Sequence, residues 1–437
     1  MGRQPRPSGN IRLRDIINHL CCCTPAIANK FALMSASAYI CHENPKKMLD
    51  QILLAPYYIA LKIRHALYDS GIRKVHSAEI PAISVGNVTV GGTGKTPHTE
   101  MLIRLLSGHT RWAGSSLAVL SRGYRRKSRG FQQVMAEPAA DGNGIRCTLS
   151  AFFGDEPLQI KRKFPGITVA VDKNRVEGCD FLRHPEKLAA SKKGRKCIFK
   201  DFRPADLVIL DDAFQYRALS PSVSIVLVNY NRPVSRDHLI PAGRLRDLPE
   251  RLRKADILIV TKCPYYMENE EKAEWAADLG VREYDPETCT GTAPDGKRQA
   301  LFFTTVRYDT LAPVFKEGDQ RYAYAKQAIM FTGIADDTPL MRFLSDSYKI
   351  MRQLSFGDHH EFSAGDISSL KKLAGEYPTA IIVTTEKDSQ RLTDMQKMPS
   401  VLKERMFYAP IKADFLTPEE EIRFIEVLDS LLPSQTA

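Results

Sequence analysis

Short apolar runs alternate with amphipathic helical stretches along the middle of the chain, as expected for a parallel α/β sheet. Between residue 76 and about residue 265, each apolar run has the length of one buried strand, and helical patterns separate the runs. The predicted strands are Ala82–Val85, Leu117–Leu120, Thr168–Val171, Leu207–Leu210, Ser224–Val228 and Ile257–Val260. We therefore predict an α/β core over residues 76–298.

The same alternation resumes near Gln299 and predicts a second, smaller α/β module over residues 299–437. A stretch rich in charge, proline and glycine, Glu268 to Lys297, is typical of a connection between two such units. The elements predicted in the module are the strands Ala328–Thr332 and Ala380–Thr384 and the helices Pro339–Ser345 and Ile367–Ala374.

An amphipathic helical pattern precedes the core, from Met48 to Asp69, with Leu53, Tyr57 and Leu61 on one face. Tyrosines and nearby basic residues within residues 48–75 suit a helix that lies in a membrane interface. A helix packed on the protein's own core gives the same pattern, so the residues alone leave both interpretations open.

Residues 1–47 fit no fold pattern, and we expect them to be disordered or to result from a start site placed too far upstream. Met48 would then be the natural beginning of the protein. A signal peptide is disfavoured because Lys30 splits the apolar region and no small-residue cleavage site follows it. The sequence has no run of about 18 apolar residues, so we expect no conventional transmembrane helix.

A glycine-rich turn between the first predicted strand and the helical pattern that follows predicts a phosphate-binding loop. Glycines let backbone N–H groups approach phosphate oxygens, Lys95 can reach the terminal phosphates, and the Thr96 hydroxyl can hold Mg²⁺. The usual first glycine of the motif is replaced by Thr89. The loop comprises Thr89, Val90, Gly91, Gly92, Thr93, Gly94, Lys95 and Thr96.

Two acidic pairs are the candidates for metal and proton chemistry. Asp211 and Asp212 follow an apolar strand, and an acid at a strand end beside a phosphate loop holds Mg²⁺ directly or through water. Asp155 belongs to a second pair before a helical stretch and is a candidate for accepting a substrate hydroxyl proton. His359 follows Asp358 and could orient such a carboxylate. A strand–turn boundary and a helix cap are the ordinary explanations for these two acidic pairs.

Composition favours anionic small-molecule partners. The net charge of +11 is attractive to nucleic acid, phosphorylated substrates or an acidic membrane face. Because aromatic-rich RNA motifs and zinc-finger spacings are missing, we expect no nucleic-acid partner. The nine cysteines contain no C-x-x-C pair and fit a reducing cytosol. Arginine forks match phosphate oxygens, and Arg175 and Arg246 are candidates for such contacts. Pro264 stands where a guanine-reading Asp would be, which favours ATP over GTP.

These motifs, in this order, resemble the tetraacyldisaccharide 4′-kinase family of the lipid A pathway of Gram-negative bacteria. The likeness runs from about Met48 to about Leu392 and leaves residues 1–47 outside. The matching stretches are Ser84–Pro97, Leu120–Tyr124, Gly154–Pro157, Asp211–Gln215, Ile240–Gly243 with Arg246, Thr332–Ile334, Asp358–His359 and Thr385–Asp388.

The resemblance implies a P-loop kinase that uses ATP and Mg²⁺ to phosphorylate the 4′-hydroxyl of the tetraacyldisaccharide 1-phosphate, giving lipid IVA. It implies that Asp155 is the catalytic acid–base group, that His359 assists it, and that the strand-end acids hold the metal. Substrate-binding positions fall on Arg175, Gln215 and Arg246. The resemblance also implies a peripheral protein whose N-terminal helix docks on the cytoplasmic face of the inner membrane.

Two other classes share parts of the pattern. Deviant phosphate-loop ATPases that position or partition other molecules share the Gly-Gly-Thr-Gly-Lys-Thr core, but they carry a lysine where Val90 stands. A basic ATPase that binds nucleic acid fits the net charge alone. ATP turnover with a lipid A precursor, compared with turnover with DNA, separates these classes from the kinase.

Overall fold

The computed structural model describes residues 45–137, 145, 147–192, 194–358, 360–395 and 397–433, with the backbone alone for residues 45–53. The chain divides into two compact units, Met1–Ala60 and Leu61–Ala437. Helix α3 (Pro45–Asp69) begins in the first unit and ends in the second. This confirms the helix predicted from Met48 to Asp69. Within the described residues, no helix has the length and apolarity needed to span a membrane.

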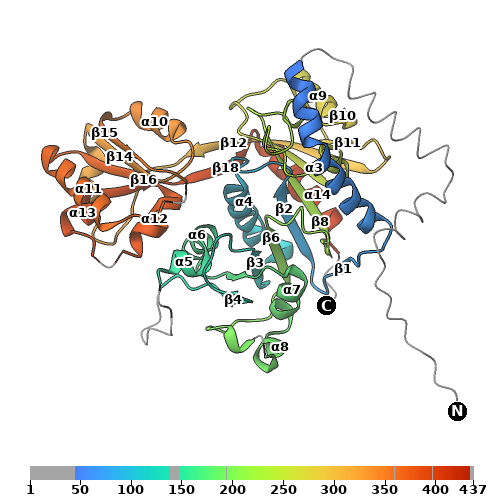
Figure 1. The fold of residues 1–437 in the computed structure, drawn as a ribbon, viewed down its shortest axis with the longest axis horizontal. Coiled ribbons are helices and arrows are strands. Elements are labelled where there is room, and N and C mark those ends of the chain that lie inside the picture. The colour runs from blue at the N-terminus through green and yellow to red at the C-terminus, as the bar shows by residue number, and fades with distance from the viewer. Residues whose placement is uncertain are drawn as a thin grey trace. The chain divides into compact units, whose positions relative to one another are not determined.

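A large sheet organises the second unit, and its strand order is β10-β11-β12-β9-β8-β2-β6-β3-β5-β4, with β18 beside β12 (Figure 1). From β5 to β12 the neighbouring strands are parallel. Its strands are β2 (Ala82–Asn87), β3 (Leu117–Ser121), β4 (Gln132–Gln133), β5 (Thr168–Val171), β6 (Leu207–Asp211), β8 (Val223–Asn229), β9 (Ile257–Thr261), β10 (Arg282–Asp285), β11 (Thr290–Thr292), β12 (Arg298–Tyr308) and β18 (Ile411–Phe415). A separate two-stranded sheet pairs β1 (His76–Ser77) with β7 (Leu219–Ser220).

Both faces of the large sheet are covered, because successive residues of each strand point to opposite sides. In β2, Ile83 and Val85 belong to one apolar cluster and Ala82 to another. Leu102 of α4 packs in the first cluster, and Leu182 of α7 in the second. The helices around this sheet are α4 (Lys95–Gly108), α5 (Leu149–Phe153), α6 (Asp155–Lys163), α7 (Arg175–Arg183), α8 (Pro185–Ala190), α9 (Asn269–Asp278) and α14 (Pro418–Leu431).

The smaller sheet has the order β13-β17-β16-β14-β15 and is parallel except for the β13–β17 pair. Its strands are β13 (Ala312–Pro313), β14 (Gln327–Thr332), β15 (Lys349–Ser355), β16 (Ile381–Thr385) and β17 (Met406–Ala409). Its helices are α10 (Thr338–Ser345), α11 (Ala364–Glu376), α12 (Glu386–Thr393) and α13 (Ser400–Arg405). The P-loop-type core with a smaller α/β module is therefore the fold class that the sequence predicted.

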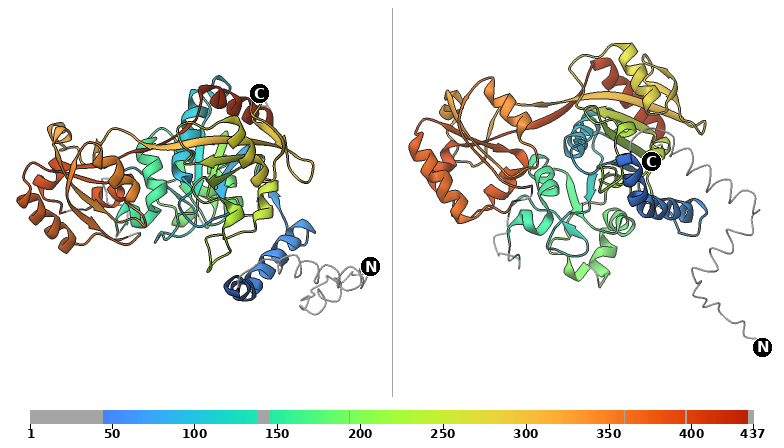
Figure 2. Two further views of the ribbon diagram at one scale, coloured as in Figure 1. Left: turned by 90° about the horizontal axis from the view of Figure 1, so that it is seen from above. Right: turned by 45° about the horizontal axis from the view of Figure 1, so that its top comes forward.

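Strand β12 is the last strand of the large sheet before the chain enters the smaller one. Residues 300–303 pair in parallel with β9, and residues 304–308 pair antiparallel with β18 (Figure 1). After β18, which is also a strand of the large sheet, helix α14 lies along β12 (Figure 2). There Phe424 packs 5.3 Å from Phe302 and 5.0 Å from Phe415 between ring centroids. The predicted boundary at residue 299 thus falls at the start of a strand of the large sheet, and the last helix also packs on that sheet.

Candidate active site

The glycine-rich loop joins β2 to α4 and is held by its own threonines. Gly91, Gly92 and Gly94 have φ values of 68°, 70° and 76°, a left-handed region in which a Cβ atom is strained. The buried Thr93 accepts a hydrogen bond at its hydroxyl from the Asn87 amide (2.7 Å) and at its carbonyl from Thr261 (3.0 Å). The loop is therefore a fixed cradle.

The helix that follows the cradle begins without a side-chain cap. Its N-cap residue is Gly94, so the N–H groups of the first turn, from Lys95 on, are not capped by an N-cap side chain. The Lys95 ammonium is mostly buried and lies 3.8 Å from Asp212. A helix N-terminus with a lysine inside it binds phosphate groups.

Asp212 is held by arginine. Arg246 donates to both oxygens of Asp212, at 3.2 Å to Oδ2 and closer still to Oδ1, and it donates to Asn87 Oδ1 at 2.5 Å. Burial acts to raise the pKa of Asp212, but Lys95 and Arg246 outweigh it and hold that pKa below its ordinary value. Asp212 is therefore ionised and fixed in place.

Asp211, in contrast, has two buried carboxylate oxygens without a hydrogen-bond partner among the described residues. Burial, together with the carboxylates of Glu156 and Asp212, raises the pKa of Asp211 well above its ordinary value. An unpaired buried carboxylate is costly unless a cation satisfies it. Carboxylate and hydroxyl oxygens are the hard ligands that Mg²⁺ prefers, so the chemistry of Asp211 and Thr96 fits a magnesium ion.

The substitution Asp211→Asn should stabilise the metal-free protein at neutral and alkaline pH. Because the folded pKa of Asp211 lies above its unfolded value, its stabilising contribution is present at acid pH and is lost as the pH rises through the folded pKa. Thermal melting at pH 8 should show a Tm raised by about 2 °C over the native chain, with no difference at pH 4. An unchanged or lower Tm at pH 8 would contradict this account of Asp211.

Arg175 and Gln215 hold the strand ends around these acids. The buried Arg175 donates to the backbone carbonyls of Asp172 (2.5 Å), which directly follows β5, and Asp211 (3.2 Å), the last residue of β6. Gln215 donates its side-chain amide to the carbonyl of Asn87 at a short distance. These contacts fix the edge of the sheet from which the acids project, and the predicted substrate contacts of both residues stay predictions.

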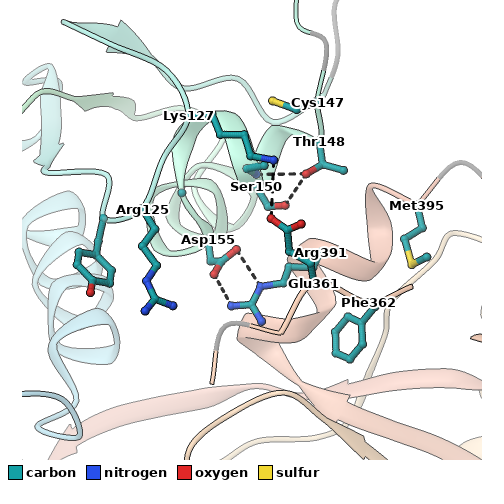
Figure 3. Close-up of a pocket in the computed structure, with 13 residues that line it drawn as sticks. Arg125, Lys127, Cys147, Thr148, Ser150, Asp155, Glu361, Phe362, Arg391 and Met395 are labelled. Carbon is teal, nitrogen blue, oxygen red and sulfur yellow. Dashed lines mark hydrogen bonds and ion pairs between the residues drawn. The ribbon is translucent and has the colours of Figure 1, made fainter. Parts of the chain in front are cut away.

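Asp155 begins α6 and faces a cavity of about 660 Å³ (Figure 3). Arg391 of α12 meets it with a two-point fork: Nε donates to Oδ1 at 3.1 Å, and Nη2 makes a shorter contact with Oδ2. Asp388 orients the same guanidinium at 3.1 Å. Arg125, Lys127, Phe362 and Met395 also line the cavity, which therefore combines positive charge with an apolar wall.

The predicted partner of Asp155, His359, lies outside the described residues, so its assignment stays a prediction. Its neighbour His360 is well tethered. The ring of His360 stacks on Phe356 with 4.4 Å between centroids and hydrogen-bonds Asp366 at 2.9 Å, and its carbonyl accepts from Arg391 at 3.2 Å. The chain beside position 359 is thus connected to the guanidinium that holds Asp155.

Arg391 and Asn87 were not predicted as site residues from the sequence. Arg391 follows the quoted Thr385–Asp388 stretch by one helical turn, and its i,i+3 spacing from Asp388 was the available signal. Its contact with Asp155 joins residues far apart in the chain, which local patterns do not reveal.

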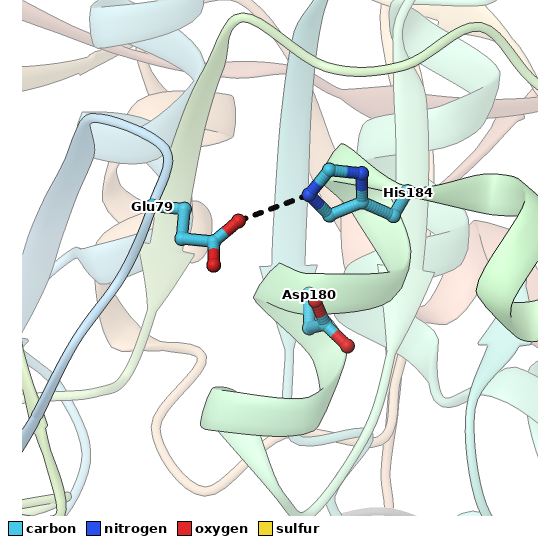
Figure 4. Close-up of side chains that lie close together, drawn as sticks. All are labelled: Glu79, Asp180 and His184. Atoms are coloured by element: carbon cyan, nitrogen blue, oxygen red, sulfur yellow. Dashed lines mark hydrogen bonds and ion pairs between the residues drawn. The ribbon is translucent and has the colours of Figure 1, made fainter.

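A second group of possible metal ligands lies away from the loop: Glu79, Asp180 and His184 (Figure 4). His184 meets Glu79 at 3.0 Å, and Lys187 meets Asp180 at 2.6 Å. The lysine ammonium already neutralises one of the two acids. We therefore interpret the group as a surface ion-pair cluster.

Comparison with known proteins gives one consistent result. The family model described as tetraacyldisaccharide-1-P 4′-kinase matches residues 48–432. A tetraacyldisaccharide 4′-kinase of Phocaeicola vulgatus is 38% identical over 372 residues, which cover 84% of this chain and 90% of that protein. The Bacteroides thetaiotaomicron protein of the same name is 35% identical over 380 residues, covering 84% and 88%.

A more distant similarity is structural. LpxK from Aquifex aeolicus, crystallised in complex with ATP, aligns with a TM-score of 0.57 and 24% identity over 88% of this chain and 99% of that chain. At this identity the likeness supports the fold alone.

Proposed function

This chain belongs to the tetraacyldisaccharide-1-P 4′-kinase family, and we propose that it transfers the γ-phosphate of ATP to the 4′-hydroxyl of tetraacyldisaccharide 1-phosphate. The product would be lipid IVA. The observation that carries the proposal is the phosphate loop beside a buried carboxylate, Asp211, whose oxygens have no hydrogen-bond partner in the part of the chain that the structure describes. That combination binds a metal-bound triphosphate.

One group of residues would bind the phosphate donor, and another would bind the acceptor. The loop amides and Lys95 bind the phosphates, and Arg246 keeps Asp212 and Asn87 in register beside them. Mg²⁺, when bound by Thr96 and Asp211 with Asp212 nearby, supplies positive charge to the phosphate oxygens. Fixed charges of this kind account for most of the catalysis of phosphoryl transfer.

The acceptor would enter the cavity at Asp155. As the 4′-oxygen forms its bond to the γ-phosphorus, the bond to the β,γ-bridging oxygen breaks and Asp155 takes the hydroxyl proton. Both Asp155 oxygens contact Arg391, yet a carboxylate oxygen has a second lone pair that can accept this proton. The cavity's positive and apolar walls suit a phosphorylated sugar that carries acyl chains.

We also propose that α3 holds the protein at the cytoplasmic face of the inner membrane as a peripheral protein. Ile59 and Ile63, one helical turn apart, are each 53% exposed. Large exposed apolar side chains on a helix that also carries basic residues suit an interfacial helix, because the apolar face enters the acyl boundary.

A transfer assay decides between this function and the competing ATPases. Purified protein with labelled ATP should phosphorylate the disaccharide lipid, and omission of Mg²⁺ should abolish the transfer. A parallel reaction with DNA in place of lipid should give no stimulation of ATP turnover. Stimulation by DNA alone would overturn the kinase in favour of a nucleic-acid ATPase, and lipid-independent turnover would favour the positioning ATPases.

A further inference from the structure

The last two turns of α3, residues 61–69, contact the two loops that hold the phosphate loop. One loop follows β6 and contains Gln215, and the other contains Arg246 and Asp247. We infer that these turns are part of the frame of the nucleotide site, with His65 and Arg64 as positioning residues. The inference rests on the proposed function only in assuming that the phosphate loop binds ATP.

His65 makes the first link. Its ring is buried, with Nε2 2.6 Å from Oδ1 of the fully buried Asp247 and Nδ1 3.2 Å from Nη1 of Arg217. A guanidinium only donates, so Nδ1 accepts and Nε2 carries the proton that goes to Asp247. The ring thus bridges two loops, and Arg217 also donates to the carbonyl of His65 at 3.1 Å.

The backbone at Asp247 in turn contacts the residues that begin the phosphate loop. The backbone N–H groups of Arg246 and Asp247 both donate to the carbonyl of Val88, at 2.9 and 3.3 Å. Two residues on, the N–H of Val90 donates to the carbonyl of Arg244 at 2.7 Å. The segment that His65 anchors therefore runs beside the first residues of the loop and fixes their backbone.

Arg64 makes the second link, through its donation to the carbonyl of Gln215 at 2.5 Å. The Gln215 side chain donates to the carbonyl of Asn87, and Arg246 donates to the Asn87 side chain at 2.5 Å. Asn87 in turn donates to the hydroxyls of Thr89 and Thr93, at 3.3 and 2.7 Å. Both links from α3 therefore lead to Asn87, the last residue of β2, whose side chain binds the threonines of the loop.

Two connected hydrogen-bond routes from one helix to the residues before the phosphate loop have a functional consequence. A loop that is ordered before ligand arrives loses less conformational entropy on binding, so cutting a link should weaken nucleotide binding without altering the groups that contact it. Couplings between a frame and a site are typically about 5- to 150-fold in affinity.

The test measures the affinity of the full chain for a fluorescent ATP analogue with Mg²⁺ and without lipid. His65→Ala and Arg64→Ala should each raise the Kd about tenfold. His65→Gln should restore much of the loss, because a glutamine amide can still donate to Asp247. Lys62→Ala removes a positive charge from the same helix, in an exposed ion pair with Glu250, and should leave the Kd unchanged.

Thermal melting of each variant separates a misfolded protein from a weakened site. If His65→Ala is unfolded, Arg64→Ala and the His65→Gln variant still decide, since Arg64 is only partly buried. Folded His65→Ala and Arg64→Ala variants with the native Kd would overturn the inference. A native chain that does not bind ATP would instead overturn the proposed function, so the two failures are distinguishable.

Discussion

Lys95→Ala should lower the kcat of phosphoryl transfer about 10³-fold. The Lys95 ammonium lies at the start of α4, mostly buried and 3.8 Å from Asp212, where it can follow charge that moves onto the phosphate oxygens. Because Lys95 interacts with charge that develops in the transition state, the effect should fall on kcat more than on KM for the lipid. Initial rates with labelled ATP and saturating disaccharide lipid measure it.

Lys254→Ala is a matched control, since Lys254 is an exposed lysine in an ion pair with Asp295. Its kcat should stay within about twofold of the native value, because exposed ion pairs contribute little. The fold of Lys95→Ala should be intact, because Asp212 keeps its two contacts with Arg246. A Lys95→Ala protein with near-native kcat would end the assignment of this loop to the triphosphate.

Eight strands of the two sheets, β2, β3, β5, β6, β8, β9, β14 and β16, could be predicted because most of their residues are buried on both faces, although the equally buried start of β12 was not. Thr168–Val171 was predicted with the bounds of β5, and Ile257–Val260 lies within β9. A parallel strand covered on both sides is a continuous apolar run, which a sequence shows directly. The phosphate loop was equally visible, since its glycines and Lys95 are adjacent in the chain.

Elements with few apolar residues were not predicted from the sequence. The predicted connection from Glu268 to Lys297 contains α9 and the edge strands β10 and β11. Strand β10 is largely exposed, so its sequence shows no apolar run. The basic segment from Glu186 to Lys200 contains most of α8 (Pro185–Ala190), whose Leu188 is fully buried. In such segments one or two buried side chains determine the structure, and the many charged residues around them leave no recognisable apolar pattern in the sequence.

The residues of the candidate site also fall into those that could be predicted from the sequence and those that could not. Lys95, Asp211 and Asp212 were found because each follows or precedes a recognisable strand. Arg391 was not, because its importance arises only where α6 and α12 meet. Where α6 and α12 meet, Arg162 also forms an ion pair with Asp394 at 2.5 Å. Asp155, which begins α6, is therefore held by charged residues from another part of the chain.

Because Asp155 lies at the contact between α6 and α12, the variant Asp155→Asn can test whether it acts as a base or as a structural contact. Asparagine keeps the size of the side chain and one acceptor for Arg391 but cannot take a proton at neutral pH, so kcat should fall about 10²–10⁴-fold with little change in KM for the lipid. Initial rates at saturating ATP measure the loss.

Asp394→Asn is the matched control for Asp155→Asn. It weakens the same α6–α12 contact, where Asp394 accepts hydrogen bonds from Arg162 and the Ser150 N–H, but it leaves the carboxylate of Asp155 in the cavity. If Asp155 acts by accepting the proton, only Asp155→Asn should lose turnover, even where melting shows that both variants are destabilised to the same extent. Equal losses of kcat in the two variants would instead mean that Asp155 serves to dock α12, and the proton would have to leave by another group.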